Sequence, residues 1–217
     1  MPEVLTLGHL RCPPSATFTY DTVIALGPQE LRCVTRDTIA VAEEHVSIGS
    51  VVESDDGVTS DEVTLDRATL RLRERFARQV GAVIKVSYDG AGFESVRRLG
   101  RETPVRVRTE CALVLDGSAE GYLLAHAELE SGVSYRTERH DALDGRVEAY
   151  EVRVLAERRL EGHPAQPVVT PIELRTVAPS AALVCYYVER AADNRIVHVD
   201  SVLPAGGATM RSTLRLG

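Results

Sequence analysis

The feature that most constrains the fold is an alternation of period two that runs through the second half of the chain. In Val105–Glu110, apolar or small residues alternate with charged ones. A period of two places successive side chains on opposite faces of a strand. Several such strands, each with one polar face, are typical of an antiparallel sheet. The same alternation occurs in residues 122–130, 147–156, 172–177, 183–190, 196–203 and 210–216.

The first 65 residues also predict strands, which are separated by residues that favour turns. Two adjacent prolines at 13–14 interrupt the pattern, because proline cannot donate to a strand ladder. Residues 54–61 are acidic and small, which indicates an exposed loop. Residues 116–121 and 191–195 are rich in residues that tolerate tight turns, so they predict hairpin connections.

The period changes between residues 65 and 83, where apolar residues recur every three or four positions. This spacing predicts an amphipathic helix over about 67–80 that buries Leu72 and Phe76 against a sheet. Asp66 is a suitable N-cap for this helix. A second, short helix is predicted around 93–99 and ends at Gly100.

Together these patterns predict a mainly β fold. We expect an antiparallel β-sandwich or a jelly-roll-like barrel, with one amphipathic helix and one short helix inserted mid-chain. Residues 1–217 are expected to form a single β-rich domain, since this length can bury a sizeable core. The alternative is a subdivision into strands with a helical insert over 1–103 and an antiparallel sheet over 104–217.

The charge balance is acidic, although the basic residues are nearly all arginine. The chain has 32 Asp and Glu against 25 Lys and Arg, a net charge of −7, and Lys85 is its only lysine. A GC-rich genome or a salt-adapted host would each account for this arginine-rich, acidic composition. Without a basic stripe, the sequence argues against a dedicated nucleic-acid-binding protein.

One local cluster of arginines stands out against this acidic background. Arg71, Arg75 and Arg78 would share the outer face of the predicted helix, so we take them as a candidate interaction face. The alternative is a solvated face held by Glu–Arg pairs at helical spacing.

The sequence predicts no metal site and no cofactor. Of the four cysteines, Cys111 and Cys185 fall on apolar faces of predicted strands, so we expect buried, reduced thiols. A zinc site needs four ligands in tetrahedral geometry. One set of residues could supply four ligands but matches no familiar spacing: His9, Cys12, Cys33 and His45.

No catalytic residue can be assigned from motifs. His140 and Asp141 could form a general-base pair, but their charged, turn-like context favours a solvated loop. His126 and His198 are predicted on the polar faces of strands, as surface histidines. There is no nucleophile elbow, P-loop or zinc-protease motif.

The sequence contains no signal-peptide pattern and no apolar run of about 20 residues that could span a bilayer. We therefore expect a soluble protein in the cytoplasm or in a virion. The favoured function is a non-enzymatic structural protein, such as a virion or other particle subunit. It would form oligomers with itself or with other subunits through sheet edges and charged faces. The alternatives are a β-barrel or sandwich module that binds a small-molecule ligand, and an enzyme whose residues meet only in space.

Overall fold

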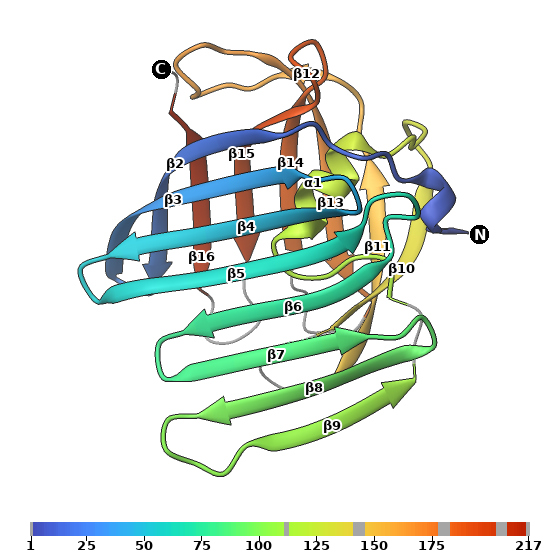
Figure 1. The fold of residues 1–217 in the computed structure, drawn as a ribbon. Coiled ribbons are helices and arrows are strands. Elements are labelled where there is room, and N and C mark those ends of the chain that lie inside the picture. Colours follow the sequence, from blue (N-terminus) through green and yellow to red (C-terminus); the bar gives the residue numbers. More distant parts are fainter. Residues whose placement is uncertain (1, 111–112, 141–145, 178–182, 203–207, 216–217) are drawn as a thin grey trace.

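The computed structural model describes residues 2–110, 113–140, 146–177, 183–202 and 208–215. Within these ranges the chain forms a sheet of sixteen strands and one α-helix, α1 (Ala119–His126), so the predicted mainly β fold is confirmed (Figure 1). A short 3-10 helix, η1, spans Leu7–His9. The strands are β1 (Glu3–Val4), β2 (Ala16–Leu26), β3 (Gln29–Val41), β4 (His45–Ser54), β5 (Gly57–Asp66), β6 (Leu72–Gln79), β7 (Ala82–Tyr88), β8 (Gly92–Leu99), β9 (Val105–Glu110), β10 (Ser134–His140), β11 (Val147–Val154), β12 (Arg158–Arg159), β13 (Val168–Thr176), β14 (Leu183–Glu189), β15 (Arg195–Val202) and β16 (Thr209–Leu214).

The strand order is set mainly by hairpins between neighbours in the sequence. The order along the sheet is β1-β10-β11-β13-β14-β15-β16-β2-β3-β4-β5-β6-β7-β8-β9, and β12 pairs beside β13. Pairing of β16 with β2 continues the C-terminal strands into the N-terminal ones. As a result, strands from residues 1–103 and from 104–217 belong to the same sheet.

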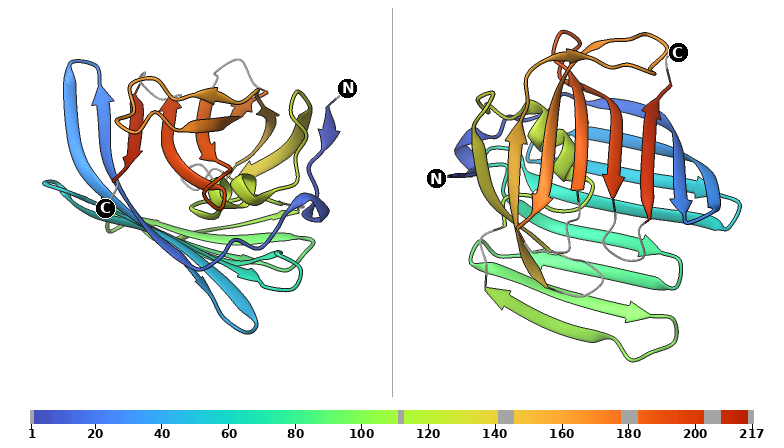
Figure 2. Two further views of the ribbon diagram at one scale, coloured as in Figure 1. Left: turned by 90° about the horizontal axis from the view of Figure 1, so that it is seen from above. Right: turned by 180° about the vertical axis from the view of Figure 1, so that it is seen from behind.

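The sheet folds back over itself into two facing layers. Seen from above, β2–β9 form one layer and β10–β16 the other, with α1 between them (Figure 2). Alternate side chains of both layers point inward and pack on α1. The main core includes Ile48 and Leu65 from the first layer, Leu123 and Leu124 from α1, and Leu174 from the second layer.

The helix predicted over 67–80 is wrong, because this segment is a turn followed by β6. Asp66 caps a turn instead of a helix, and its Oδ1 accepts from the Thr69 backbone N–H at 2.9 Å. β6 then pairs with β5 on one side and β7 on the other, so two full ladders outweigh the local periodicity. Leu72 is buried as predicted, whereas Phe76 points outward and is 42% exposed.

The second predicted helix is also wrong, since residues 92–99 form β8. The observed helix, α1, lies where a hairpin turn and a strand were predicted. Residues 119–125 are all buried, so α1 has no polar face and gives no amphipathic signal. Gly121 permits its close approach to β14, because a Cβ there would lie 2.5 Å from Cε1 of Tyr186. No helix in the described residues is long and apolar enough to cross a membrane.

Candidate functional site

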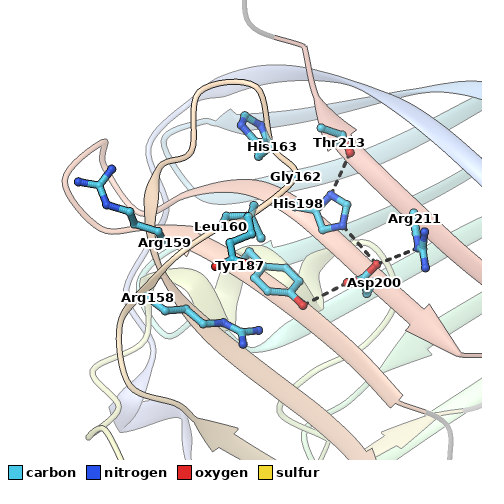
Figure 3. A pocket seen from close by; sticks show the side chains of 11 residues that line it. Arg158, Arg159, Leu160, Gly162, His163, Tyr187, His198, Asp200, Arg211 and Thr213 are labelled. Carbon is cyan, nitrogen blue, oxygen red and sulfur yellow. Dashed lines mark hydrogen bonds and ion pairs between the residues drawn. The ribbon is translucent and has the colours of Figure 1, made fainter.

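A pocket of about 650 Å³ lies on the outer face of β14, β15 and β16, beneath the segment that contains β12 (Figure 3). The face follows from the alternation of β14. The Tyr186 hydroxyl donates to Glu120 on α1, so its neighbour Tyr187 points to the opposite side of the sheet. The pocket is lined by Arg158, Arg159, Leu160, Glu161, Gly162, His163, Tyr187, His198, Asp200, Arg211 and Thr213.

Asp200 organises the sheet side of the pocket. Its Oδ2 accepts from the Tyr187 hydroxyl at 3.1 Å, its Oδ1 lies 3.2 Å from His198 Nε2, and Arg211 Nε lies 3.6 Å from Oδ1. A carboxylate only accepts, so His198 Nε2 carries a proton and Nδ1 accepts from the Thr213 hydroxyl at 2.9 Å. One carboxylate therefore fixes three side chains that face the pocket, and two of them come from neighbouring strands.

Tyr187 remains a protonated donor within this arrangement. Burial, followed by the nearby Cys185 and Asp200, raises the pKa of Tyr187 above its ordinary value. Its ring also lies against His198, with 5.4 Å between the ring centroids.

The covering segment, residues 158–163, brings positive charge to the pocket. The Arg158 guanidinium carbon lies 5.7 Å from the centroid of the Tyr187 ring, a cation–π arrangement. Figure 3 shows Arg158 directed beneath Tyr187, whereas Arg159 points away. Neither arginine forms an ion pair with a described residue, and Asp200 is already shared among Tyr187, His198 and Arg211. Three arginines and two carboxylates line the pocket, but Arg159 points away and Arg211 is paired with Asp200, so Arg158 is the arginine that faces the pocket without a carboxylate among the described residues.

His163 closes the pocket from the covering segment and is only 6% exposed. Its Nδ1 accepts from the Ala165 backbone N–H at 3.2 Å, while its Nε2 is buried without a hydrogen-bond partner among the described residues. Burial, and next the nearby His198, lower the pKa of His163 below 6.5.

A second group of ionisable side chains lies inside the molecule, where α1 and the preceding residues meet the sheet. Arg75 of β6 lies between two carboxylates, with Nη1 2.6 Å from Asp116 Oδ1 and Nε 2.9 Å from Asp61 Oδ1. The Tyr88 hydroxyl also donates to Asp116. Burial alone would lower the pKa of Arg75, but Asp116 and Asp61 leave it raised.

The same interior group continues along α1 itself. Glu120 accepts from the Tyr186 hydroxyl at 2.7 Å and pairs with Arg139 at 3.1 Å. The Tyr122 hydroxyl donates to Asp37 of β3 at 2.7 Å. A ligand site needs a concave surface that a ligand can enter, whereas these side chains are packed between the layers and fix α1 in place.

The structure does not bring the predicted arginine face together. Arg75 points inward with 8% of its side chain exposed, Arg78 points outward from the same strand, and Arg71 lies in the turn before it. The period of two in a strand separates residues that a helix would have placed on one face. The three arginines are not a shared surface.

The predicted histidine and cysteine sites have separate outcomes. His140 is 1% exposed at the end of β10, with Nδ1 3.8 Å from Asp116 Oδ2, so the expected solvated loop is wrong for this residue. Asp141 and Cys111 lie outside the described residues. His126 ends α1, and its Nδ1 lies 3.0 Å from the Tyr122 carbonyl oxygen.

Cys185 is 6% exposed, which confirms its predicted burial. In the described part of the chain, no group of three or more His, Cys, Asp or Glu side chains could hold a metal ion. The four residues weighed as zinc ligands differ in their surroundings. Cys33 is buried on β3, Cys12 is exposed, His45 is exposed at the start of β4, and His9 Nδ1 accepts from the Thr6 backbone N–H.

No family model matches the chain, and no curated protein sequence matches it either. Among solved structures, the chain is similar to the β-barrel-like protein of the domain of unknown function DUF1849 from Brucella abortus. The TM-score is 0.59 at 15% sequence identity, over 95% of this chain and 97% of that chain. At this identity the likeness supports the β-barrel-like fold and leaves function to be argued from the site.

Proposed function

We propose that this protein is a non-enzymatic ligand-binding module that holds a small anionic molecule in the pocket beneath β12. The observation that carries the proposal is Arg158, which is held over Tyr187 without a carboxylate partner among the described residues. A guanidinium placed in this way presents its N–H groups to a carboxylate or a phosphate.

The surroundings of Arg158 favour the same class of ligand. The chain has a net charge of −7, yet Arg158 at this pocket has no carboxylate partner among the described residues. Leu160 and the Tyr187 ring add apolar surface beside the charged groups. A small oxyanion attached to an apolar group would complement both parts.

Binding of phenyl phosphate and of benzoate, measured by calorimetry, tests this proposal, with phenol as the uncharged comparison. Both anions should bind saturably and phenol should not. Arg158→Gln should raise the Kd about tenfold or more, the usual effect of losing a charged hydrogen bond. Arg106→Gln is the matched control, because Arg106 lies on β9 with 70% of its side chain exposed and is paired with Glu94. Equal Kd values for the two variants, or no anion binding at all, would reject the proposal.

A hydrolase is the second candidate, favoured by one observation. Thr213, His198 and Asp200 form a hydroxyl–imidazole–carboxylate row at the pocket wall, the arrangement used in nucleophilic catalysis. We rank it below binding because β16 is paired on both sides, which occupies backbone donors that could stabilise an oxyanion. Turnover of p-nitrophenyl acetate that disappears in Thr213→Val would favour the hydrolase.

Assembly into a virion or another particle remains the prediction from sequence. It would place the contacts at sheet edges such as β9 and predicts oligomers at high concentration. No contact among the described residues favours it over ligand binding, so we rank it below the pocket. The mass of the purified protein in low and high salt tests it.

A further inference from the structure

The first layer of the sheet ends in β9, a strand with a free edge. β9 is the last strand in the sheet order and pairs with β8 and with no other described strand. Figure 1 shows β9 at the lower margin of the sheet, with no described strand or helix beyond it. All six of its residues are exposed or half-buried. Such an edge presents backbone N–H and C=O groups with which another strand can pair.

The hydrogen bonds of the neighbouring hairpin show which backbone groups of β9 are free. At one end of the hairpin of β7 and β8, the Asp89 N–H donates to the Gly92 carbonyl oxygen at 3.2 Å. At the other end, the Gly100 N–H donates to the Gly81 carbonyl oxygen at 2.6 Å. The even-numbered residues of β8 therefore bond to β7. Because bonding alternates along an antiparallel pair, the odd-numbered residues of β8 and β9 bond to each other. The N–H and C=O groups of the even-numbered residues of β9 point to the free edge.

The even-numbered residues of β9 are Arg106, Arg108 and Glu110, and their side chains lie on the outer face of the sheet. The odd-numbered residues face inward, because their partners on β8 include Phe93 and Ser95, which are buried. On the outer face, 70% of the Arg106 side chain and 48% of the Arg108 side chain are exposed. A strand that joins this edge must therefore suit two arginines and a glutamate.

We propose that β9 pairs with β9 of a second copy of this chain, antiparallel and about a two-fold axis at Arg108. A two-fold axis perpendicular to the sheet places even-numbered residues opposite even-numbered ones and keeps both outer faces on one side. In this register, Arg106 lies opposite the partner's Glu110, and Glu110 lies opposite the partner's Arg106. The free N–H and C=O groups of all three residues then have partners, and two pairs of opposite charge stabilise the contact.

Charge and chain chemistry select this register from its neighbours. An axis one residue earlier would place Arg106 opposite the partner's Arg108, and like charges directly opposite destabilise a sheet. It would also require Pro104, which has no N–H to donate. An axis one residue later would leave Arg106 outside the paired segment. In the chosen register the two copies of Arg108 face each other, but each is already paired with its own Asp89 at 2.6 Å.

This contact closes on itself, because each copy uses the free edge of β9 for the other. Association through β9 therefore ends at a dimer and does not build a particle. The contact is also separate from the outer pocket, since no residue of β9 lines that pocket. Dimer formation and anion binding can be rejected independently of each other.

Exchange of the two charges tests the contact. Sedimentation velocity at protein concentrations up to about 1 mM should show a dimer. Arg106→Glu and Glu110→Arg should each raise the dimer Kd about tenfold or more, because like charges then lie opposite. The double variant restores opposite charges with exchanged signs, so its Kd should return to within about threefold of wild type. Arg32→Glu, at an exposed position of β3, is the control and should leave the Kd unchanged. A monomer at every concentration, single variants without effect, or a double variant without recovery would overturn the proposal.

A disulfide measures the register directly. Opposite Cα atoms of a hydrogen-bonded antiparallel pair lie about 5.5 Å apart, within the range that a disulfide bridges. Arg108→Cys should therefore form a disulfide between two copies under mild oxidation, and mass spectrometry of the linked peptide should identify it. Arg106→Cys is the matched control on the same strand and face, because the two copies of that position lie about 14 Å apart in this register. It should link at least about tenfold more slowly. Linkage at equal rates, or in neither variant, would overturn the proposal.

Discussion

The interior group around α1 and the outer pocket use the same residue types but balance their charges differently. Inside, Arg75 contacts Asp116 and Asp61, and each carboxylate has a cation or a hydroxyl within hydrogen-bonding distance. In the pocket, Asp200 is shared by three side chains while Arg158 has no carboxylate among the described residues. A buried charge must be paired, but a cation at a solvent-accessible site can be left for a ligand.

This difference separates structural charges from binding charges. Asp116, Glu120 and Tyr122 lie within seven residues of each other and contact β6, β10 and β3 respectively. Such contacts fix where α1 lies between two layers that apolar packing alone would constrain less. Removal of an interior charge should therefore affect folding, and removal of a pocket charge should affect binding.

The largest effect is expected for Asp116→Ala, which leaves Arg75 buried with only Asp61 as a partner. Breaking a buried pair in this way costs about 3–5 kcal/mol of unfolding free energy. Urea denaturation should measure this loss, with Glu128→Ala as the control. Glu128 pairs with Arg11 at the surface with 66% of its side chain exposed, so its loss should stay below about 1 kcal/mol. Equal losses would show that the interior pair is not structural.

A second test uses apolar side chains on the two faces of β6. Leu72→Ala should cost about 2–5 kcal/mol because Leu72 is 6% exposed in the main core. Phe76→Ala should cost less than about 1 kcal/mol, since Phe76 is 42% exposed on the outer face. Denaturant melts of both variants check this. A larger loss of unfolding free energy in Phe76→Ala than in Leu72→Ala would show that Phe76, and not Leu72, faces the core.

β6 also shows why part of the fold could be predicted and part could not. The alternation in β9, β11 and β15 is visible in the sequence because charged or polar residues recur along one face of each strand. In β6, the apolar spacing from Leu72 to Phe76 imitates a helix although the two residues lie on opposite faces. A bulge beside Leu65 shifts the register there, and pairing with the neighbouring strands β5 and β7 decides the outcome.

The helix α1 and the pocket escaped prediction for different physical reasons. α1 is buried on all sides, so it lacks the polar stripe by which a helix is recognised. The pocket joins residues of β12 to residues of β14–β16, and only the fold brings them together. The sequence placed His198 on a polar strand face. Arg158 and Arg159, which have no ion pair with a described residue, are adjacent in the sequence and match no recognisable motif.

A third test concerns the cover over the outer face and uses cysteine reactivity. Burial raises the pKa of the Cys185 thiol from 9.0 to about 11, so about 100-fold less thiolate is present near pH 8. Cys12 is exposed and should react with a thiol reagent at least about 100-fold faster in the native protein. Mass spectrometry of peptides from partly labelled protein measures both rates. Similar rates would mean that the outer face beside Tyr187 is open.

The smallest effect, and the one that best separates the two regions, is their dependence on pH. Burial lowers the pKa of His163 in the folded protein below 6.5. As the pH falls, the His163 ring is therefore protonated in the unfolded chain at a higher pH than in the folded protein. Stability from the neutral ring is therefore complete above pH 6.5 and is lost as the pH falls through the folded pKa, by about 1.4 kcal/mol for each unit of lowering.

The interior carboxylate of Asp116 also loses its contribution to stability as the pH falls, but at a lower pH than His163 does. Burial would raise the pKa of Asp116, yet Arg75 and His140 leave it below 3.8, so its contribution is lost only in stronger acid. Melting temperatures of wild type and His163→Gln, followed from pH 8 to pH 3, should therefore diverge below pH 6.5. They should then run parallel once the ring is protonated, while both proteins lose the contribution of Asp116 at the acid end. Parallel curves between pH 7 and pH 5 would show that His163 titrates alike in the folded and unfolded states, and that the covering segment leaves it in water.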